Sequence, residues 1–139
     1  MGENKSKKFP DYYPECCPPI KSINGDLTVY RIIESNTIKP REFISIGEKK
    51  KKYFSPTCNN FGISLLTDPA DLHIAKNFFA SISMEKKNKV AVGNITQDSG
   101  LYAYEPSNNV GKSHINWWTY LDVEPHTYFK EVLRIGVDI

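Results

Sequence analysis

The residues best suited to chemistry lie in a short segment that holds both tryptophans and one of the three histidines of the chain. It runs Ser113-His114-Ile115-Asn116-Trp117-Trp118-Thr119-Tyr120-Leu121. If the segment is a β-strand, alternate residues point to the same face. The residues that share a face with His114 are Asn116, Trp118 and Tyr120. An imidazole beside an amide and aromatic rings can act as a general base or orient a ligand. A structural histidine at the start of a strand is the alternative interpretation.

The two tryptophans are adjacent, so they cannot both point to the buried side of one strand. The face that carries Ile115, Trp117 and Leu121 has the composition of a buried face. One tryptophan therefore faces the other side, where the N-terminal segment, a partner protein or a flat ligand must cover it. The residues that we predict to contact a ligand or partner are Tyr30, Asn116, Trp117, Trp118 and Tyr120.

Arg31 is the second candidate, because it falls inside an apolar strand pattern. A guanidinium among apolar neighbours either reaches out near a strand end or is partly buried with an anionic partner. Its planar fork is suited to the phosphate or carboxylate group of a ligand. Structural pairing with Asp26, Glu34 or Glu42 is the alternative. We predict that Arg31 and His114 lie near one cleft, which is the functional site.

A third set consists of Asp122, Glu124 and His126, spaced two residues apart, with His114 upstream. Two carboxylates and two histidines on one strand face form a plausible ligand set for a divalent metal. Pro125 interrupts the strand pattern, so we expect a surface loop here and predict neither a metal nor a cofactor. The sequence lacks the glycine loops of nucleotide-binding folds, the serine elbow of hydrolases and the His-Glu-x-x-His zinc motif.

The three cysteines are Cys16, Cys17 and Cys58. Their odd number and the lack of a Cys-x-x-Cys spacing argue against a disulfide framework and against a structural zinc site. One of the adjacent pair could meet Cys58 in space, but we expect buried free thiols.

Length and charge restrict the class of protein. A chain of 139 residues is expected to form one domain. The net charge is +2, and four lysines at 49–52, expected in an exposed loop, account for the excess. This small excess argues against nucleic acid as a partner. No segment approaches the ~18 apolar residues of a membrane helix, and no apolar leader follows Met1, so we expect a cytoplasmic protein.

The order of expected elements predicts an α+β fold. Residues 1–22 contain four prolines and are expected to form a tail or strap, and residues 23–139 form the single compact domain. Strands are expected at 27–34, 61–66, 90–96, 101–104, 113–121 and near the C-terminus, where Leu133, Ile135, Val137 and Ile139 alternate. Asp68 as a cap and Pro69 at the first position predict the main helix over 69–82. We expect a mostly antiparallel, twisted sheet.

A succession of short motifs then suggests a family. The motifs are Cys17-Pro18-Pro19, Val29-Tyr30-Arg31, Arg41-Glu42-Phe43-Ile44-Ser45, Cys58, Phe61-Gly62-Ile63-Ser64-Leu65, Lys89–Gly93 and His114-Ile115-Asn116-Trp117-Trp118. With them the chain resembles, over about residues 16–120, a family of small uncharacterised bacterial proteins. The resemblance implies no activity, but it suggests that Arg31, Cys58 and His114 belong to one motif set.

The strand with Val29-Tyr30-Arg31 also resembles the opening strand of compact ADP-ribosyltransferase-like toxins of the DarT and RES kind. That resemblance implies that Arg31 holds the diphosphate of NAD and that Tyr30 or Trp118 stacks on nicotinamide. It also implies that a late glutamate, Glu124 or Glu131, stabilises the oxocarbenium ion. The chain departs from these toxins because it has no Ser-Thr-Ser triplet and no Glu-x-Glu motif.

Two functions of different class follow from these patterns. The first is a small bacterial binding or interaction protein, in a defence or toxin–antitoxin setting, that contacts a protein partner or a small nucleotide-like ligand. The second is an ADP-ribosyltransferase-like enzyme acting on NAD or a nucleotide, with Arg31, His114 and Glu124 as its catalytic residues. The enzyme requires a basic residue, a histidine and a carboxylate at one concave pocket. The interaction protein requires an exposed apolar patch.

Overall fold

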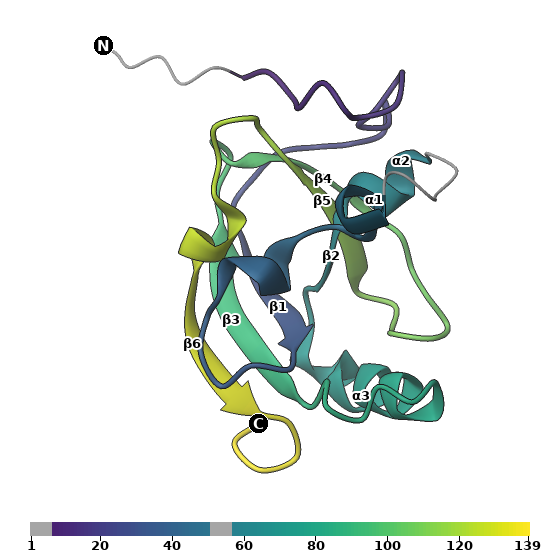
Figure 1. Cartoon of the computed structure of the whole chain (residues 1–139), viewed down its shortest axis with the longest axis vertical. Helices are drawn as coiled ribbons and strands as arrows, with labels where there is room; N and C mark the ends of the chain where they lie inside the picture. Colours follow the sequence, from purple (N-terminus) through teal and green to yellow (C-terminus); the bar gives the residue numbers. More distant parts are fainter. Residues whose placement is uncertain (1–6, 51–56) are drawn as a thin grey trace.

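Six antiparallel strands form one sheet in the order β4-β5-β2-β1-β3-β6 (Figure 1). The structure is a computed structural model and describes residues 7–50 and 57–139. The strands are β1 (Leu27–Ile33), β2 (Ile63–Leu66), β3 (Lys89–Ile95), β4 (Gly100–Tyr104), β5 (His114–Thr119) and β6 (Phe129–Arg134). The helices are α1 (Ile46–Lys50), α2 (Cys58–Phe61) and α3 (Leu72–Ser81), and the 3₁₀ turns are η1 (Pro40–Phe43), η2 (Pro69–Asp71) and η3 (Pro125–Tyr128). The predicted α+β domain with an antiparallel sheet and one main helix is confirmed.

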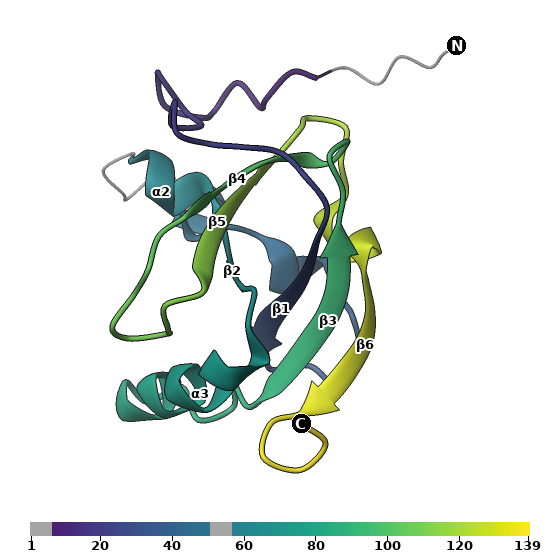
Figure 2. The ribbon, with the colours of Figure 1, turned by 180° about the vertical axis from the view of Figure 1, so that it is seen from behind.

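The sheet is nearly divided between β1 and β2. β1 pairs with β3 along all seven of its residues, whereas it pairs with β2 at one position, Tyr30 with Leu66. On the other side, β2 pairs with β5 over four positions. The sheet therefore consists of two three-stranded halves that meet at one point and then diverge, as the view from behind shows (Figure 2).

Alternation along the strands produces an apolar layer on each face. Val29, Ile33 and Trp117 belong to the larger core cluster on one face. On the opposite face, Ile32 and Leu66 pack against the buried side of α3. This is the period-two pattern of strands that are covered on both sides.

The main helix begins where the sequence predicts. The Asp68 carboxylate accepts the backbone N–H of Ala70 at 2.9 Å, and Pro69 occupies the first helical position. The first turn is a 3₁₀ turn, η2, which continues into α3. Leu72 and Ala75 of α3 are buried against the sheet, whereas Ile82, the last residue of the predicted helix, is 48% exposed.

The N-terminal strap covers one end of the sheet. Phe9, Tyr13 and Cys17 pack against a buried cluster that contains Phe61 and Trp118. Figure 1 shows the strap crossing above β4 and β5. Of the three coverings considered for the outward-facing tryptophan, the strap is the one that the structure contains.

One cysteine prediction is wrong. Cys17 and Cys58 form a disulfide with a Cα–Cα distance of 5.3 Å, and Cys16 is free and exposed. Sequence spacing gives no signal for this pair, because the strap and the start of α2 meet only in the folded chain. Stable disulfides are typical of oxidising compartments and rare in the cytosol. The bond therefore weighs against the expected cytoplasmic location, while no helix in the described part of the chain is long and apolar enough to cross a membrane.

The C-terminal strand prediction is also partly wrong. β6 ends at Arg134, and the remaining residues form a turn. Gly136 adopts a φ of 88°, and the Asp138 carboxylate accepts the backbone N–H of Arg134 at 2.9 Å. This local turn overrides the alternating apolar pattern.

The lysine run was expected in an exposed loop. Its first two residues, Lys49 and Lys50, are instead the last residues of α1, and residues 51 and 52 lie outside the described part of the chain.

The disulfide gives the first testable prediction. It closes a loop with a sequence separation of 41, so a Cys58→Ser substitution should lower the free energy of unfolding by up to about 4 kcal/mol. Urea unfolding of the oxidised proteins measures this loss. Cys16→Ser is the matched control and should leave stability within about 0.5 kcal/mol. Three reactive thiols in the native protein, or an unchanged midpoint for Cys58→Ser, would contradict the bond.

Candidate functional site

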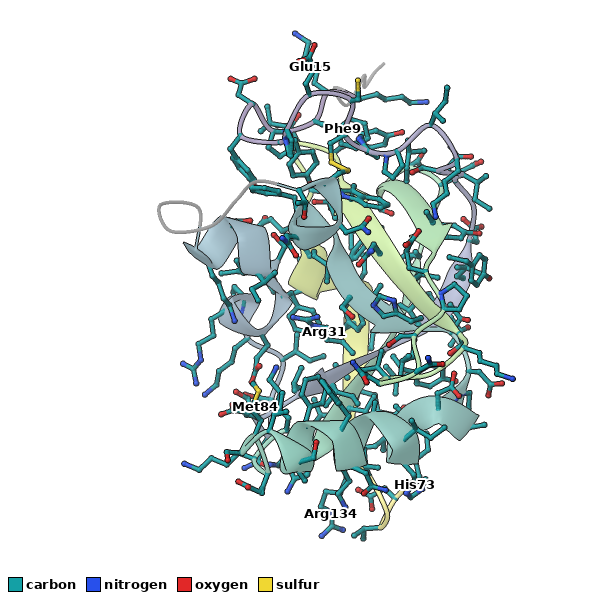
Figure 3. The ribbon with its side chains drawn as sticks, turned by 90° about the vertical axis from the view of Figure 1, so that its right-hand side faces the viewer. Phe9, Glu15, Arg31, His73, Met84 and Arg134 are labelled. Atoms are coloured by element: carbon teal, nitrogen blue, oxygen red, sulfur yellow. A yellow bond between two sulfur atoms is a disulfide. The ribbon has the colours of Figure 1, made fainter. Side chains whose placement is uncertain are left out.

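An open cleft of about 720 Å³ lies where β1 and β2 diverge. Its walls come from the sheet, from α1 and α2 on one side, and from α3 and the segment after it on the other. Figure 3 shows Arg31 between these two groups of helices. The polar side chains that the sheet contributes to the cleft are Arg31 from β1, Ser64 from β2, and His114 and Asn116 from β5.

Arg31 bridges the two halves of the sheet. Its Nε donates to the backbone oxygen of Glu42 at 2.9 Å, and its Nη1 donates to the backbone oxygen of Ser64 at 2.9 Å. Within residues 7–50 and 57–139, no carboxylate lies within ion-pair distance of the guanidinium. A guanidinium carries five N–H donors. Two of these are satisfied by the carbonyls, so the group retains both its charge and donors for a ligand.

The pKa values of the cleft cations follow from their surroundings. Burial lowers the pKa of Arg31 to about 10, and Glu42 opposes that effect. Burial also lowers the pKa of Lys87, with further lowering from Arg31 and Lys49. The Lys87 ammonium lies 5.2 Å from the centre of the Phe79 ring, on the wall that α3 contributes. Arg31, Lys49 and Lys87 therefore lie close enough to lower the pKa of Lys87, whereas Glu42 and Glu34 oppose that effect.

Ser64 and His114 form a hydrogen-bonded pair inside this cleft. The Ser64 Oγ lies 2.6 Å from His114 Nε2, and His114 Nδ1 lies 2.7 Å from the backbone oxygen of Glu105. A carbonyl oxygen can only accept, so Nδ1 carries the proton. In the neutral ring Nε2 is then bare and accepts the Ser64 hydroxyl proton. The chain of donors runs in one direction, from Ser64 through His114 to Glu105.

His114 is neutral near pH 7 for a physical reason. Burial lowers its pKa below the ordinary value, the Glu105 carbonyl and carboxylate oppose this, and the Arg31 charge lowers it further. A neutral imidazole with a bare Nε2 is the form that can accept a proton from a hydroxyl.

Three carboxylates line the cleft, and two of them already have partners. Glu42 Oε2 accepts the backbone N–H groups of Glu34 and Ser35 at 3.1 and 2.8 Å. Glu105 forms an ion pair with Lys21. Glu34 is exposed at the rim.

Glu124 does not join this site. It precedes η3 and lines a separate cavity of about 310 Å³ together with Tyr12, Tyr120 and His126. Glu131 is exposed on β6, in the other half of the sheet. The predicted catalytic role of a late glutamate therefore has no place in the cleft. Glu124 and Glu131 follow His114 in the sequence, but the chain turns away from the cleft after β5.

The aromatic residues of the predicted contact set are mostly covered. Trp117 is 1% exposed and donates to Ser99 Oγ at 3.1 Å. Trp118 is 0% exposed and donates to the backbone oxygen of Cys58 at 2.9 Å. Tyr120 is also buried. The tryptophans thus offer no surface to a partner in this conformation, whereas Tyr30 lines a small cavity of about 50 Å³ beside Arg31.

Sequence reasoning missed Ser64, Lys87 and the carbonyl of Glu105. Ser64 is exposed, whereas the other three residues of β2 are buried. A serine in an otherwise apolar strand was the available signal for this position. Lys87 and Glu105 lie in connections whose course depends on tertiary contacts, so no local pattern identifies them.

Metal ligands are not grouped in the described residues. No set of three or more histidine, cysteine, aspartate or glutamate side chains there is placed to hold an ion. His114 and His126 line different cavities, so the four residues considered as a metal set are not brought together.

Comparison of the chain with protein-family models, curated proteins and solved structures finds no match. Both sequence resemblances therefore stay predictions.

The shifted pKa of His114 predicts a pH dependence of stability. Its folded pKa lies below the ordinary 6.5, so at lower pH the unfolded chain binds the proton first. Protonation of this histidine in the unfolded chain therefore lowers the free energy of unfolding as the pH falls below about 6.5, by at most about 1.4 kcal/mol per pH unit. The difference in unfolding free energy between His114→Gln and the unsubstituted protein should shrink between pH 7.5 and 5.

Urea unfolding at the two pH values measures that difference. His73→Gln, on the exposed side of α3, serves as the matched control. A difference for His114→Gln that stays constant across the range, or that grows toward pH 5, would contradict a neutral, half-buried imidazole.

Proposed function

We propose that the cleft binds a small phosphate-bearing nucleotide, with NAD as the first candidate. The observation that carries this proposal is the Arg31 guanidinium, which is partly buried, tied to two carbonyls and without a carboxylate partner in the described part of the chain. A guanidinium with unsatisfied donors matches the oxygen atoms of a phosphate. Lys87 adds a second positive charge to the same cleft.

The size and lining of the cleft support a ligand of this kind. A volume of about 720 Å³ falls within the ~300–1,000 Å³ typical of small-molecule sites. Opposite the polar sheet residues, Phe79, Ile82 and Met84 supply an apolar wall. A flat base can pack on such a wall while its phosphates face the cations.

The reaction that we propose for the site is transfer of ADP-ribose from NAD, as the resemblance to ADP-ribosyltransferase-like toxins implies. In its support, Arg31, His114 and carboxylates line one concave cleft, as such an enzyme requires. In this proposal Arg31 binds the diphosphate. Glu34, at the rim, would take the role that Glu124 and Glu131 cannot fill from outside the cleft.

The second proposal, a bacterial protein that binds a macromolecular partner in a defence or toxin–antitoxin setting, has less support. It was based on the tryptophan surface, which is buried. The large apolar side chains that are exposed lie on separate segments, such as Ile20 in the strap and Val137 in the C-terminal turn. Single exposed apolar residues of this kind are ordinary.

A thermal-shift titration tests nucleotide binding. ADP and NAD, each at ~100 times the dissociation constant, should stabilise the protein by ~2.7 kcal/mol and raise the melting temperature by several degrees. Arg31→Ala should abolish the shift, because it removes the main hydrogen-bond donor to the phosphate groups of the nucleotide. Arg41→Ala is the matched control, since Arg41 is exposed outside the cleft.

Arg31 also holds the sheet halves together, so Lys87→Ala provides a second, less disruptive variant. It should weaken ADP binding several-fold while leaving the melting temperature of the unliganded protein nearly unchanged. No shift with either nucleotide, or a shift that both cleft variants retain, would overturn the proposed ligand class.

A further inference from the structure

The Ser64–His114 pair contains three parts of a nucleophilic site. These parts are a hydroxyl, a base that accepts its proton at 2.6 Å, and a group that fixes the tautomer of the base at 2.7 Å. We propose that Ser64 is a nucleophile activated by His114, and that the chain cleaves acyl esters of phosphate-bearing small molecules, such as an acylated nucleotide. The substrate class rests on the proposed binding of a phosphate-bearing nucleotide, whereas the activated serine does not. Ester cleavage would be a second reaction of the same cleft, separate from the transfer of ADP-ribose.

A purely structural role explains the pair less well. β2 and β5 are already joined by backbone pairing at four positions, including Leu66 with His114. A side-chain tie adds little there. Both side chains line the open cleft, and Ser64 is exposed on a strand that is otherwise buried. Its oxygen is thus accessible to a ligand while its proton is directed to the base.

The proposed reaction has two steps, acylation of Ser64 and hydrolysis of the acyl-serine. Ser64 Oγ forms a bond to the acyl carbon while its proton passes to His114 Nε2. The ester C–O bond then breaks, and the leaving alcohol takes the proton from Nε2. Water next gives a proton to Nε2 and attacks the acyl-serine. Ser64 Oγ departs with that proton, so the products are a carboxylic acid and an alcohol.

Two cleft side chains are suited to stabilise the oxyanion of this reaction. Asn116 lies directly opposite Ser64 in the β2–β5 pairing. Its amide has no hydrogen-bond partner within the described part of the chain. Arg31 already donates to the Ser64 carbonyl, so its positive charge lies next to the same residue. Preorganised donors and charge of this kind are the usual means of stabilising a tetrahedral intermediate.

Reaction with diisopropyl fluorophosphate tests the nucleophile directly. The Ser64 Oγ–phosphorus bond forms, the phosphorus–fluorine bond breaks, and hydrogen fluoride is released. Mass spectrometry of the digested protein should place a single adduct on Ser64, and Ser64→Ala should abolish it. Ser81→Ala is the matched control and should label normally, because Ser81 lies at the end of α3 outside the cleft.

The dependence on His114 separates an activated serine from an accessible one. His114→Gln should slow labelling by ~100-fold or more. In the unsubstituted protein the labelling rate should fall as Nε2 becomes protonated, and only at a pH below the ordinary histidine pKa of 6.5, because burial lowers the pKa of His114. The charged groups that line the cleft with His114 are Arg31, Glu34, Glu42, Lys49, Lys87 and Glu105, and of these Glu105 raises and Arg31 lowers its pKa.

The effect of ADP on the labelling rate distinguishes the nucleophile from the substrate class. Labelling of Ser64 that ADP slows in the unsubstituted protein, but not in Arg31→Ala, supports both the nucleophile and the substrate class. Labelling that ADP leaves unchanged overturns the substrate class, although the serine chemistry stands. No adduct on Ser64 in the folded protein, or an adduct rate that His114→Gln does not alter, overturns the nucleophile. The thermal shift with ADP reports on the proposed function independently of that result.

Discussion

The interaction on which the site depends is the pair of hydrogen bonds from Arg31 to the backbone oxygens of Glu42 and Ser64. They occur where backbone pairing between β1 and β2 stops. The Arg31 side chain thus connects the two halves of the sheet at the point where the backbone hydrogen bonds between β1 and β2 end. Because both acceptors are neutral carbonyls, the guanidinium keeps its full charge. A carboxylate partner would have neutralised it and removed the attraction for an anion.

The other features of the cleft follow from this divergence of strands. Once β1 leaves β2, the outer side of β2 opens, and Ser64 is exposed beside His114. Gly62 precedes β2, and a Cβ there would lie 2.6 Å from the Cβ of Asn116. Glycine at this position therefore allows Asn116 to reach the cleft. The disulfide at Cys58 fixes the start of α2, which forms the adjoining wall.

The sequence predicted the elements well, because their signals are local. Asp68 and Pro69 determine the start of the main helix, and the apolar alternation around Arg31 identified β1. For the arginine in that strand we predicted either an anionic partner or a position near a strand end. The partners, however, are carbonyls rather than the expected carboxylates. Only the folded path of the chain places those carbonyls, so no residue pattern could predict them.

The set of residues that line the cleft was harder to predict than the strands that carry them. The register Tyr30–Leu66–His114 places His114 on one face of the sheet, whereas the backbone of Arg31 directs its side chain to the other. Arg31 reaches the same cleft because the strands diverge there. Whether Arg31 and His114 line one cleft depends on the pairing of strands that are far apart in the sequence. The long-range course of the chain also places Glu124 at a different cavity.

The most direct test of a shared site is an NMR titration with ADP that follows the side-chain nitrogen signals of Arg31 and His114. If both residues line the nucleotide cleft, the Arg31 Nε–H and the His114 ring nitrogens should shift together and give one dissociation constant. Signals that do not move, or an Arg31 signal that moves while His114 stays unchanged, would contradict a single site at the divergence of β1 and β2.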